Sequence, residues 1–264
     1  MFSRKNKELN KSVKHLTIYV VLRSLVILTL ISQILHKNFE NVFMCVLTLI
    51  LFTIPIFIDK KLKIQLPSVL EGIIFLFIFS ADILGEVQNF YGIFKAWDTM
   101  LHTINGFLCA AIGFSLIDIL NRSERFHMKL TPVFVALVAF CFSMTIGILW
   151  EFFEFGMDKY LLKDMQKDRI ISTVSSVNLN EEGKNKAIIL EDIYKTEIYS
   201  IKDNKEQVTV INDGYLDIGI NDTMKDLWVN FLGAVIFSVL GMLYIKDRDG
   251  YKFTENFIPK CRQK

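Results

Sequence analysis

The stretch TPVFVALVAFCFSMTIGILWEFFEFGM, residues 131–157, decides the class of fold. It carries no charged residue before Glu151. A helix needs roughly 20 apolar residues to cross the hydrocarbon core of a bilayer. Because an apolar block of this length is too long for the core of a soluble domain, the stretch predicts a membrane-spanning helix.

Five further apolar runs have a similar length. They lie at about residues 15–36, 39–58, 68–88, 98–120 and 223–245. Of 264 residues, 52% are hydrophobic and 13% aromatic, more than a soluble domain of this size usually carries. The net charge of only +2 gives no basic surface for nucleic acid. We predict an all-α polytopic membrane protein with six transmembrane helices, a multi-pass protein embedded in a lipid bilayer.

Lysine and arginine are distributed unevenly between the two sides of these spans. They precede the first span and follow the second, fourth and sixth, at Arg4, Lys5, Lys7, Lys11, Lys14, Lys60, Lys61, Lys63, Arg122, Arg125, Lys129, Lys246, Arg248, Lys252, Lys260, Arg262 and Lys264. The short loops on the other side hold only Lys37 and Lys95. The positive-inside rule therefore places the N- and C-termini in the cytoplasm. The first span is read as an uncleaved helix, because SQILHKNFEN after it offers no small-residue cleavage site.

The connector 161–222 is the one part with soluble character. Its short β-branched runs predict a small antiparallel β insert on the extracytoplasmic side, between the fifth and sixth helices. Asn212-Asp213-Gly214 is a hairpin signal, and NEEGKN and KDNKEQ suggest looser turns. We divide the chain into membrane helices one to five (1–160), the insert (161–222), and helix six with a cytoplasmic tail (223–264). The insert contains no cysteine, so no disulfide staples it.

The triplet Asp-Thr-Met occurs twice, at 98–100 and 222–224, each time near the predicted outer start of a helix. Four residues after the two aspartates come His102 and Asp226. Helical spacing places each pair on one face, with Asn230 one turn beyond Asp226. Glycines follow both motifs, and we expect Gly106 and Gly233 to allow close helix contact.

Two more predicted helices carry acids near their outer ends, at Glu151, Glu154 and Asp158 and at Asp82 and Glu86. An acid at membrane depth costs roughly 2.5–3.5 kcal/mol on insertion scales. Several acids at one level therefore face a cavity or each other. We predict that the helices share one outward-facing polar site.

The predicted site has two sets of residues. The catalytic residues or metal ligands are His102, Glu151, Glu154 and Asp226, and the substrate-binding residues are Asp98, Asp222, Asn230, Asp82 and Glu86. Oxygen and nitrogen donors of this kind suit a divalent metal, although the sequence identifies no particular cofactor. A structural interpretation stays open, in which Asp98 and Asp222 cap their helices, Glu154 and Asp158 reach interfacial water, and His102 packs without a ligand.

Four segments together resemble a known family: YGIFKAWDTMLHTINGF, GILWEFFEFGMD, DMQ at 164–166, and DTMKDLWVNFLGA. They are similar to the YjdF-like family of uncharacterised bacterial inner-membrane proteins. A looser pattern, Asp98 with His102, then Glu151 or Glu154, then Asp226, Asn230 and Gly233, resembles the VanZ-like glycopeptide-resistance proteins. The resemblance implies a bacterial cell membrane, but it supplies no mechanism.

Three classes of function fit these residues. The first is a membrane enzyme acting on a lipid or cell-wall intermediate at the outer leaflet. The second is an ion-coupled transporter, in which membrane acids are also expected. The third is a non-catalytic protein that shields or binds the envelope through its β insert. The sequence contains no H-E-x-x-H motif, serine elbow or phosphate loop that would name a reaction.

Overall fold

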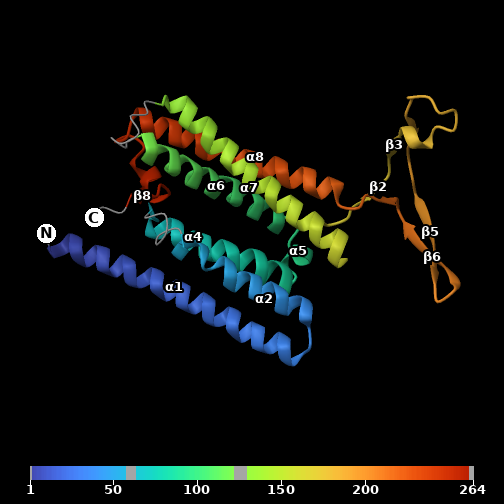
Figure 1. Ribbon diagram of the computed structural model, residues 1–264, viewed down its shortest axis with the longest axis horizontal. Helices are drawn as coiled ribbons and strands as arrows, with labels where there is room; N and C mark the ends of the chain where they lie inside the picture. The colour runs from blue at the N-terminus through green and yellow to red at the C-terminus, as the bar shows by residue number, and fades with distance from the viewer. Residues whose placement is uncertain (1, 58–63, 122–129, 262–264) are drawn as a thin grey trace. The chain divides into compact units, whose positions relative to one another are not determined.

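The structure, a computed structural model, describes residues 2–57, 64–121 and 130–261, and for residues 2–16, 64, 260 and 261 the backbone alone (Figure 1). Several basic side chains on which the predicted orientation rests lie outside this part, namely Arg4, Lys5, Lys7, Lys11, Lys14, Lys60, Lys61, Lys63, Arg122, Arg125, Lys129, Lys260, Arg262 and Lys264. The chain divides into two compact units. Unit 1 is Met1–Ile148 with Asp226–Lys264, and unit 2 is Leu149–Lys225.

Six helical spans are long and apolar enough to cross a membrane, which confirms the predicted fold class. They are formed by α1 (Phe2–Leu35), α2 (Phe39–Leu51, within a span reaching Phe57), α4 (Ser68–Ile78) with the π-helical segment η1 (Phe79–Val87), α6 (Trp97–Asn121), α7 (Pro132–Leu161) and α8 (Ile220–Lys246). A short helix, α5 (Phe90–Ile93), precedes α6. Helices α7 and α8 each have residues in both units.

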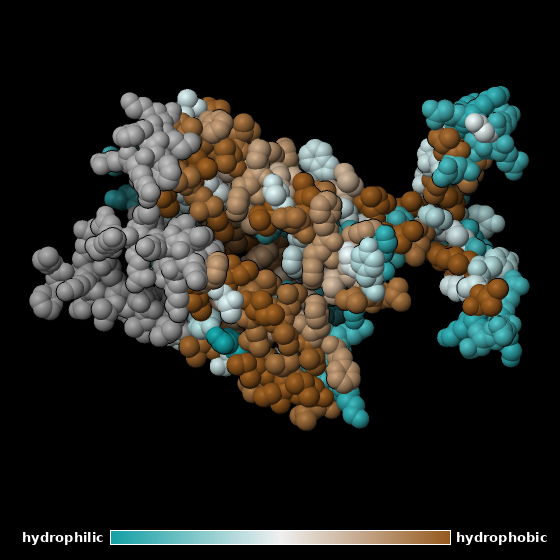
Figure 2. All heavy atoms as spheres, in the orientation of Figure 1, coloured by the Kyte–Doolittle hydropathy of each residue, from teal (hydrophilic) through white to brown (hydrophobic). Residues whose placement is uncertain are grey.

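Unit 1 contains two main apolar cores. One joins α1, α2, α4 and η1 around Val26, Cys45, Phe52, Phe75 and Ile83. The other joins α6, α7 and α8 around Phe114, Val135, Ala139, Ala234 and Phe237. Large apolar side chains also cover the outside of the helices, where Figure 2 shows broad hydrophobic surface. This outward apolar surface is what a bilayer requires of its protein.

The chain after α8 folds back onto unit 1. Residues Lys252–Asn256 form a short 3-10 helix, η3, and β8 (Lys260–Cys261) pairs antiparallel with β1 (Ile64–Gln65). The ring of Phe257 packs edge-on against Phe107 of α6, with ring centroids 5.2 Å apart. Arg248 lies 3.5 Å from Asp118 at the end of α6. The tail is therefore part of the folded helical unit.

Helices α6 and α8 approach each other at two glycines. A Cβ on Gly106 would lie 2.0 Å from the carbonyl oxygen of Asn230, and one on Gly233 would lie 2.0 Å from the carbonyl oxygen of Thr103. Real Cβ atoms do not approach backbone so closely, so both positions require glycine. The backbones are in direct contact, as small residues at helix crossings allow.

Unit 2 contains the predicted β insert as three antiparallel pairs of short strands. The pairs are β2 (Ile170–Ile171) with β7 (Tyr215–Leu216), β3 (Val174–Ser176) with β4 (Ile188–Leu190), and β5 (Lys195–Lys202) with β6 (Lys205–Asn212), and a 3-10 turn, η2 (Val177–Leu179), follows β3. The antiparallel insert is confirmed, and its long hairpin turns within KDNKEQ rather than at Asn212-Asp213-Gly214.

The tight turn of the long hairpin is Asp203-Asn204, where both residues have positive φ as a two-residue hairpin loop requires. Asn212-Asp213-Gly214 instead connects β6 to β7, and these two strands pair with β5 and β2 respectively. The chain therefore changes partner at the Asp213-Gly214 step. Gly214 sits so close to β2 that a Cβ there would lie 2.5 Å from the carbonyl oxygen of Ile171.

Candidate metal centre

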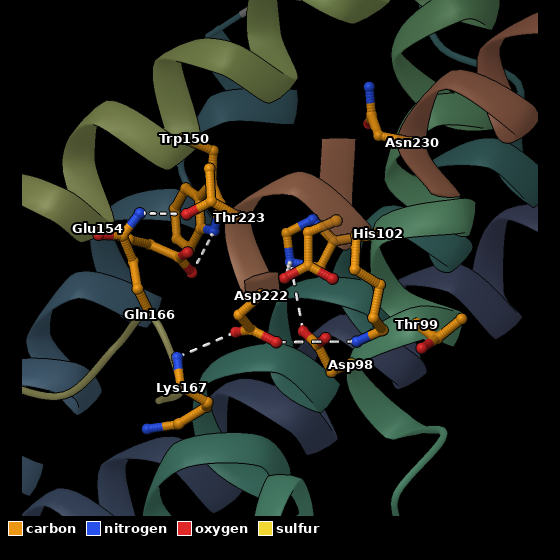
Figure 3. Close-up of polar contacts among 12 residues, drawn as sticks. Asp98, Thr99, His102, Trp150, Glu154, Gln166, Lys167, Asp222, Thr223 and Asn230 are labelled. Atoms are coloured by element: carbon orange, nitrogen blue, oxygen red, sulfur yellow. Dashed lines mark hydrogen bonds and ion pairs between the residues drawn. The ribbon is translucent and has the colours of Figure 1, made fainter. Parts of the chain in front are cut away.

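Helix α6 presents Asp98 and His102 on one face, at the spacing of a single helical turn. Nε2 of His102 lies 3.3 Å from Oδ1 of Asp98, and Figure 3 shows the two side chains turned toward one another. The His102 side chain is 11% exposed and that of Asp98 is 21% exposed. The predicted i,i+4 pair therefore forms, mostly screened from solvent.

Helix α8 brings a second carboxylate to the same imidazole nitrogen. Oδ2 of Asp226 lies 3.8 Å from Nε2 of His102, and the Asp226 side chain is only 2% exposed. The contact of α6 with α8 at Gly106 and Gly233 brings together these two residues, each four positions after an Asp-Thr-Met aspartate. The repeated triplet thus marks two helix starts whose next turns share a site.

These three residues have the geometry of a metal-binding group. One donor atom from each of Asp98, His102 and Asp226 lies within 4.8 Å of the other two. Ligand atoms at ~2.0–2.2 Å from a tetrahedral metal lie about 3.4 Å apart, which is close to the distances of both carboxylates from His102. Three protein ligands leave at least one coordination position for water or substrate. The arrangement therefore suits a reactive metal better than a structural one.

A layer of amides lies one turn below this group. Asn105 donates from Nδ2 to Oδ1 of Asn230 at 3.0 Å, and Nδ2 of Asn230 lies 3.6 Å from the sulfur of Met144 on α7. Gly147 leaves room for the Asn230 amide, since a Cβ there would lie 2.7 Å from that nitrogen. Asn230, predicted as a substrate-binding residue, therefore links α6, α7 and α8 beneath Asp226.

Glu151 and Glu154 lie in unit 2, in the C-terminal part of α7. Both are buried, with residue exposures of 5% and 8%. The indole Nε1 of Trp150 donates to Oε1 of Glu154 at 2.8 Å (Figure 3). Since Asp98, His102 and Asp226 belong to unit 1, convergence of the two glutamates with His102 stays a prediction.

Asp222 lies in the first turn of α8 and belongs to unit 2. It accepts a hydrogen bond from the backbone N–H of Lys167 at 3.0 Å, and it lies 3.4 Å from Arg169 and 3.8 Å from Lys225. Asp222 thus ties the segment before β2 to the start of α8. This is a different contact from the helix cap that the sequence suggested.

The acid that anchors the start of α8 is Asp217, which was not predicted as a functional residue. It accepts hydrogen bonds from the backbone N–H groups of Arg169 (2.7 Å), Gly219 (3.2 Å) and Asn221 (3.1 Å), and from the Asn221 side chain. Burial raises the pKa of Asp217, but these donors outweigh it and hold the pKa below its ordinary value. The signal available in the sequence was an Asp two residues before a glycine at a helix start.

Asp158 has a similar role at the end of α7. Its two carboxylate oxygens accept the backbone N–H groups of Met165 at 2.6 Å and Gln166 at 2.8 Å. The nearby Asp168 responds differently, because burial and the charges of Asp164, Asp217 and Asp158 raise its pKa. Asp158 and Asp217 are therefore stabilised by backbone amides. Asp168 is instead destabilised as an anion by the neighbouring carboxylates.

Asp82 and Glu86 lie in η1 of unit 1. Asp82 is 2% exposed, and the hydroxyl Oγ1 of Thr48 on α2 lies 2.9 Å from its Oδ2. Asp82 therefore faces α2, and the group of donor atoms around His102 does not include it. Its predicted place on the substrate-binding wall stays a prediction.

Comparison with known proteins supports the membrane assignment. Residues 17–247 match DUF2238, a family described as a predicted membrane protein. The chain belongs to this family. A similar protein, described as uncharacterized, occurs in Thermotoga maritima, with 28% identity over 107 residues, covering 40% of this chain and 53% of the relative. The match thus spans about half of that relative's length, and no solved structure matches the chain.

Proposed function

We propose that Asp98, His102 and Asp226 bind one divalent metal ion at the extracytoplasmic end of α6 and α8. The observation that carries this proposal is the presence of three donor atoms within 4.8 Å of one another on two helices in direct backbone contact. Two carboxylates supply a net negative charge that a divalent cation neutralises. A buried acid pair beside an imidazole is otherwise costly inside a membrane protein.

We further propose that the metal acts on a lipid or cell-envelope intermediate of a bacterial membrane. A bound divalent metal lowers the pKa of a coordinated water and polarises carbonyl or phosphoryl oxygens. In this proposal Asn230 and Glu86, both in unit 1, contact the substrate. The likeness to YjdF-like and VanZ-like proteins is consistent with an envelope substrate, and the exposed insert is suited to contact the envelope.

Metal analysis tests the site directly. Full-length protein purified in lipid nanodiscs, stripped with a chelator and reloaded separately with Zn²⁺, Mn²⁺ or Mg²⁺, is expected to retain about one ion per chain with at least one of them. His102→Ala and Asp226→Asn should each abolish that binding, because a two-ligand remnant holds metal weakly. His36→Ala is the matched control, since His36 contacts the backbone of Ser32 on α1.

The outcomes separate the alternatives. Retention of the ion by both His102→Ala and Asp226→Asn would place the metal elsewhere. Wild-type protein that binds none of the three ions would leave Asp98, His102 and Asp226 as a hydrogen-bonded polar group. Loss of metal from Glu154→Gln as well would extend the ligand set to α7.

A further inference from the structure

A second buried acid lies in the group of helices around α1, α2 and η1. Asp82 sits in the π-helical segment Phe79–Val87, next to the apolar core that contains Cys45 and Ile83. π-helical turns are uncommon and frequently mark functional positions within helices. This acid is distinct from the metal-binding group, whose donors are Asp98, His102 and Asp226.

The hydrogen-bond geometry at Asp82 indicates which atom carries a proton. Oγ1 of Thr48 lies 2.8 Å from the carbonyl oxygen of Met44 and 2.9 Å from Oδ2 of Asp82. A hydroxyl has one proton to donate, and the carbonyl of Met44 can only accept. Threonine in a helix characteristically donates to the carbonyl four residues earlier. If it does so here, the second short contact is made by a proton on Asp82.

The surroundings of Asp82 disfavour an ionised carboxylate. The charged or titratable groups that interact with Asp82 are Glu86 on its own element and Cys45 on α2, an acid and a thiol. Tyr91 on α5 packs against Gly85 of the same π-helical segment. Within the described part of the chain, no lysine or arginine lies within ion-pair distance of Asp82, and Arg23 of α1 contacts Tyr19.

A buried negative charge with one neutral hydroxyl neighbour is strongly disfavoured relative to the neutral acid. We infer that Asp82 is a proton-binding site in which a neutral carboxylic acid donates to Thr48 and Thr48 donates to Met44. This goes beyond the proposed metal centre, because its ligand is a proton and its residues lie on α2 and η1. It also provides the kind of group that proton-coupled membrane proteins use.

Infrared spectroscopy of the full-length protein in nanodiscs at pH 7 tests the proton directly. The difference between wild type and Asp82→Asn should show the loss of a carboxylic-acid C=O band, and Thr48→Val should shift that band to higher frequency because the acid loses its acceptor. Thr48→Val keeps Asp82 in place, so it remains informative if Asp82→Asn folds poorly. Glu40→Gln, which changes an exposed acid in the first turn of α2, is the control and should leave the band in place.

Loss of a carboxylate band in Asp82→Asn, with the carboxylic-acid region unchanged, would overturn the inference. An unshifted acid band in Thr48→Val would overturn the proposed hydrogen-bond direction. Metal content measured on the same Asp82→Asn sample should equal that of wild type. The proton site and the metal centre therefore succeed or fail separately.

Discussion

Asp98 and Asp226, in the first two turns of α6 and α8, differ from Asp158 and Asp217 in what their oxygens contact. In unit 2, Asp158 and Asp217 accept backbone N–H groups at distances of 2.6–3.2 Å. In unit 1, Asp98 and Asp226 approach the imidazole of His102 at 3.3 and 3.8 Å. The same residue type therefore serves two purposes within one chain.

The difference has a physical origin in where each aspartate lies along its element. Asp158 and Asp217 lie next to chain reversals, where backbone N–H groups have no helical partner and turn toward an acceptor. Asp226 lies inside α8, where the neighbouring N–H groups are used by the helix itself. An acid inside a membrane helix is stabilised by other side chains or by a cation. A carboxylate that accepts several amide N–H groups anchors the fold, whereas one that faces an imidazole can serve as a metal ligand.

The largest expected effect concerns the side of the membrane on which the two regions lie. Cysteine introduced at Asn204, in the tight turn of the insert, should react completely with an impermeant thiol reagent added to intact cells. Native Cys261 should react only after the membrane is opened. The readout is mass-tag labelling before and after permeabilisation. Labelling of Cys261 alone in intact cells would move the insert, and the proposed metal centre, to the cytoplasmic side.

The sequence predicted the six spans because a bilayer demands a run of apolar residues, and that demand is local. The strands of the insert were also predicted from a local signal, their short β-branched runs. Their pairing was not predicted, because it depends on contacts distant in sequence. The turn at Asp203-Asn204 was predicted only as a looser turn within KDNKEQ, because neither residue is glycine. The π-helical segment has no known local signal in this sequence.

The site was predicted in part. Helical spacing alone related Asp98 to His102, and the repeated triplet pointed to Asp226. Asn105 was missed because its role depends on which helix it faces. Its 3.0 Å contact with Asn230 of α8 is seen only in the structure. Asp217 was missed because its contact with the backbone N–H of Arg169 joins residues 48 positions apart.

The next largest effect is expected when an anchoring aspartate and a proposed metal ligand are each replaced. Asp217→Ala should lower the stability of the strand–helix junction by about 1–3 kcal/mol, because several N–H groups lose their acceptor. Hydrogen exchange by mass spectrometry should show faster exchange at residues 169–171 and 217–221, with unchanged metal content. Asp226→Asn should do the reverse, losing metal while exchange in those segments stays as in wild type. If Asp217→Ala also loses metal, the division between anchors and ligands is wrong.

The smallest expected effect is the pH dependence of the same junction. The pKa of Asp217 in the folded protein lies below its ordinary value because amides donate hydrogen bonds to it. In the unfolded chain an aspartate has a pKa of about 3.9. The folded state therefore binds fewer protons, so the stability from Asp217 is fully present above about pH 5 and declines as the pH falls through the folded pKa. Asp168, whose pKa is raised by burial and by Asp164, Asp217 and Asp158, has the opposite slope.

Protection of the amide of Asn221, corrected for intrinsic exchange, should fall between pH 5 and pH 3 in wild type, and Asp168→Asn should make that fall steeper. Asp217→Asn should remove most of the dependence, because a neutral amide does not titrate. Protection that stays constant on acidification in wild type would show that the amides, rather than the charge they surround, hold this junction together.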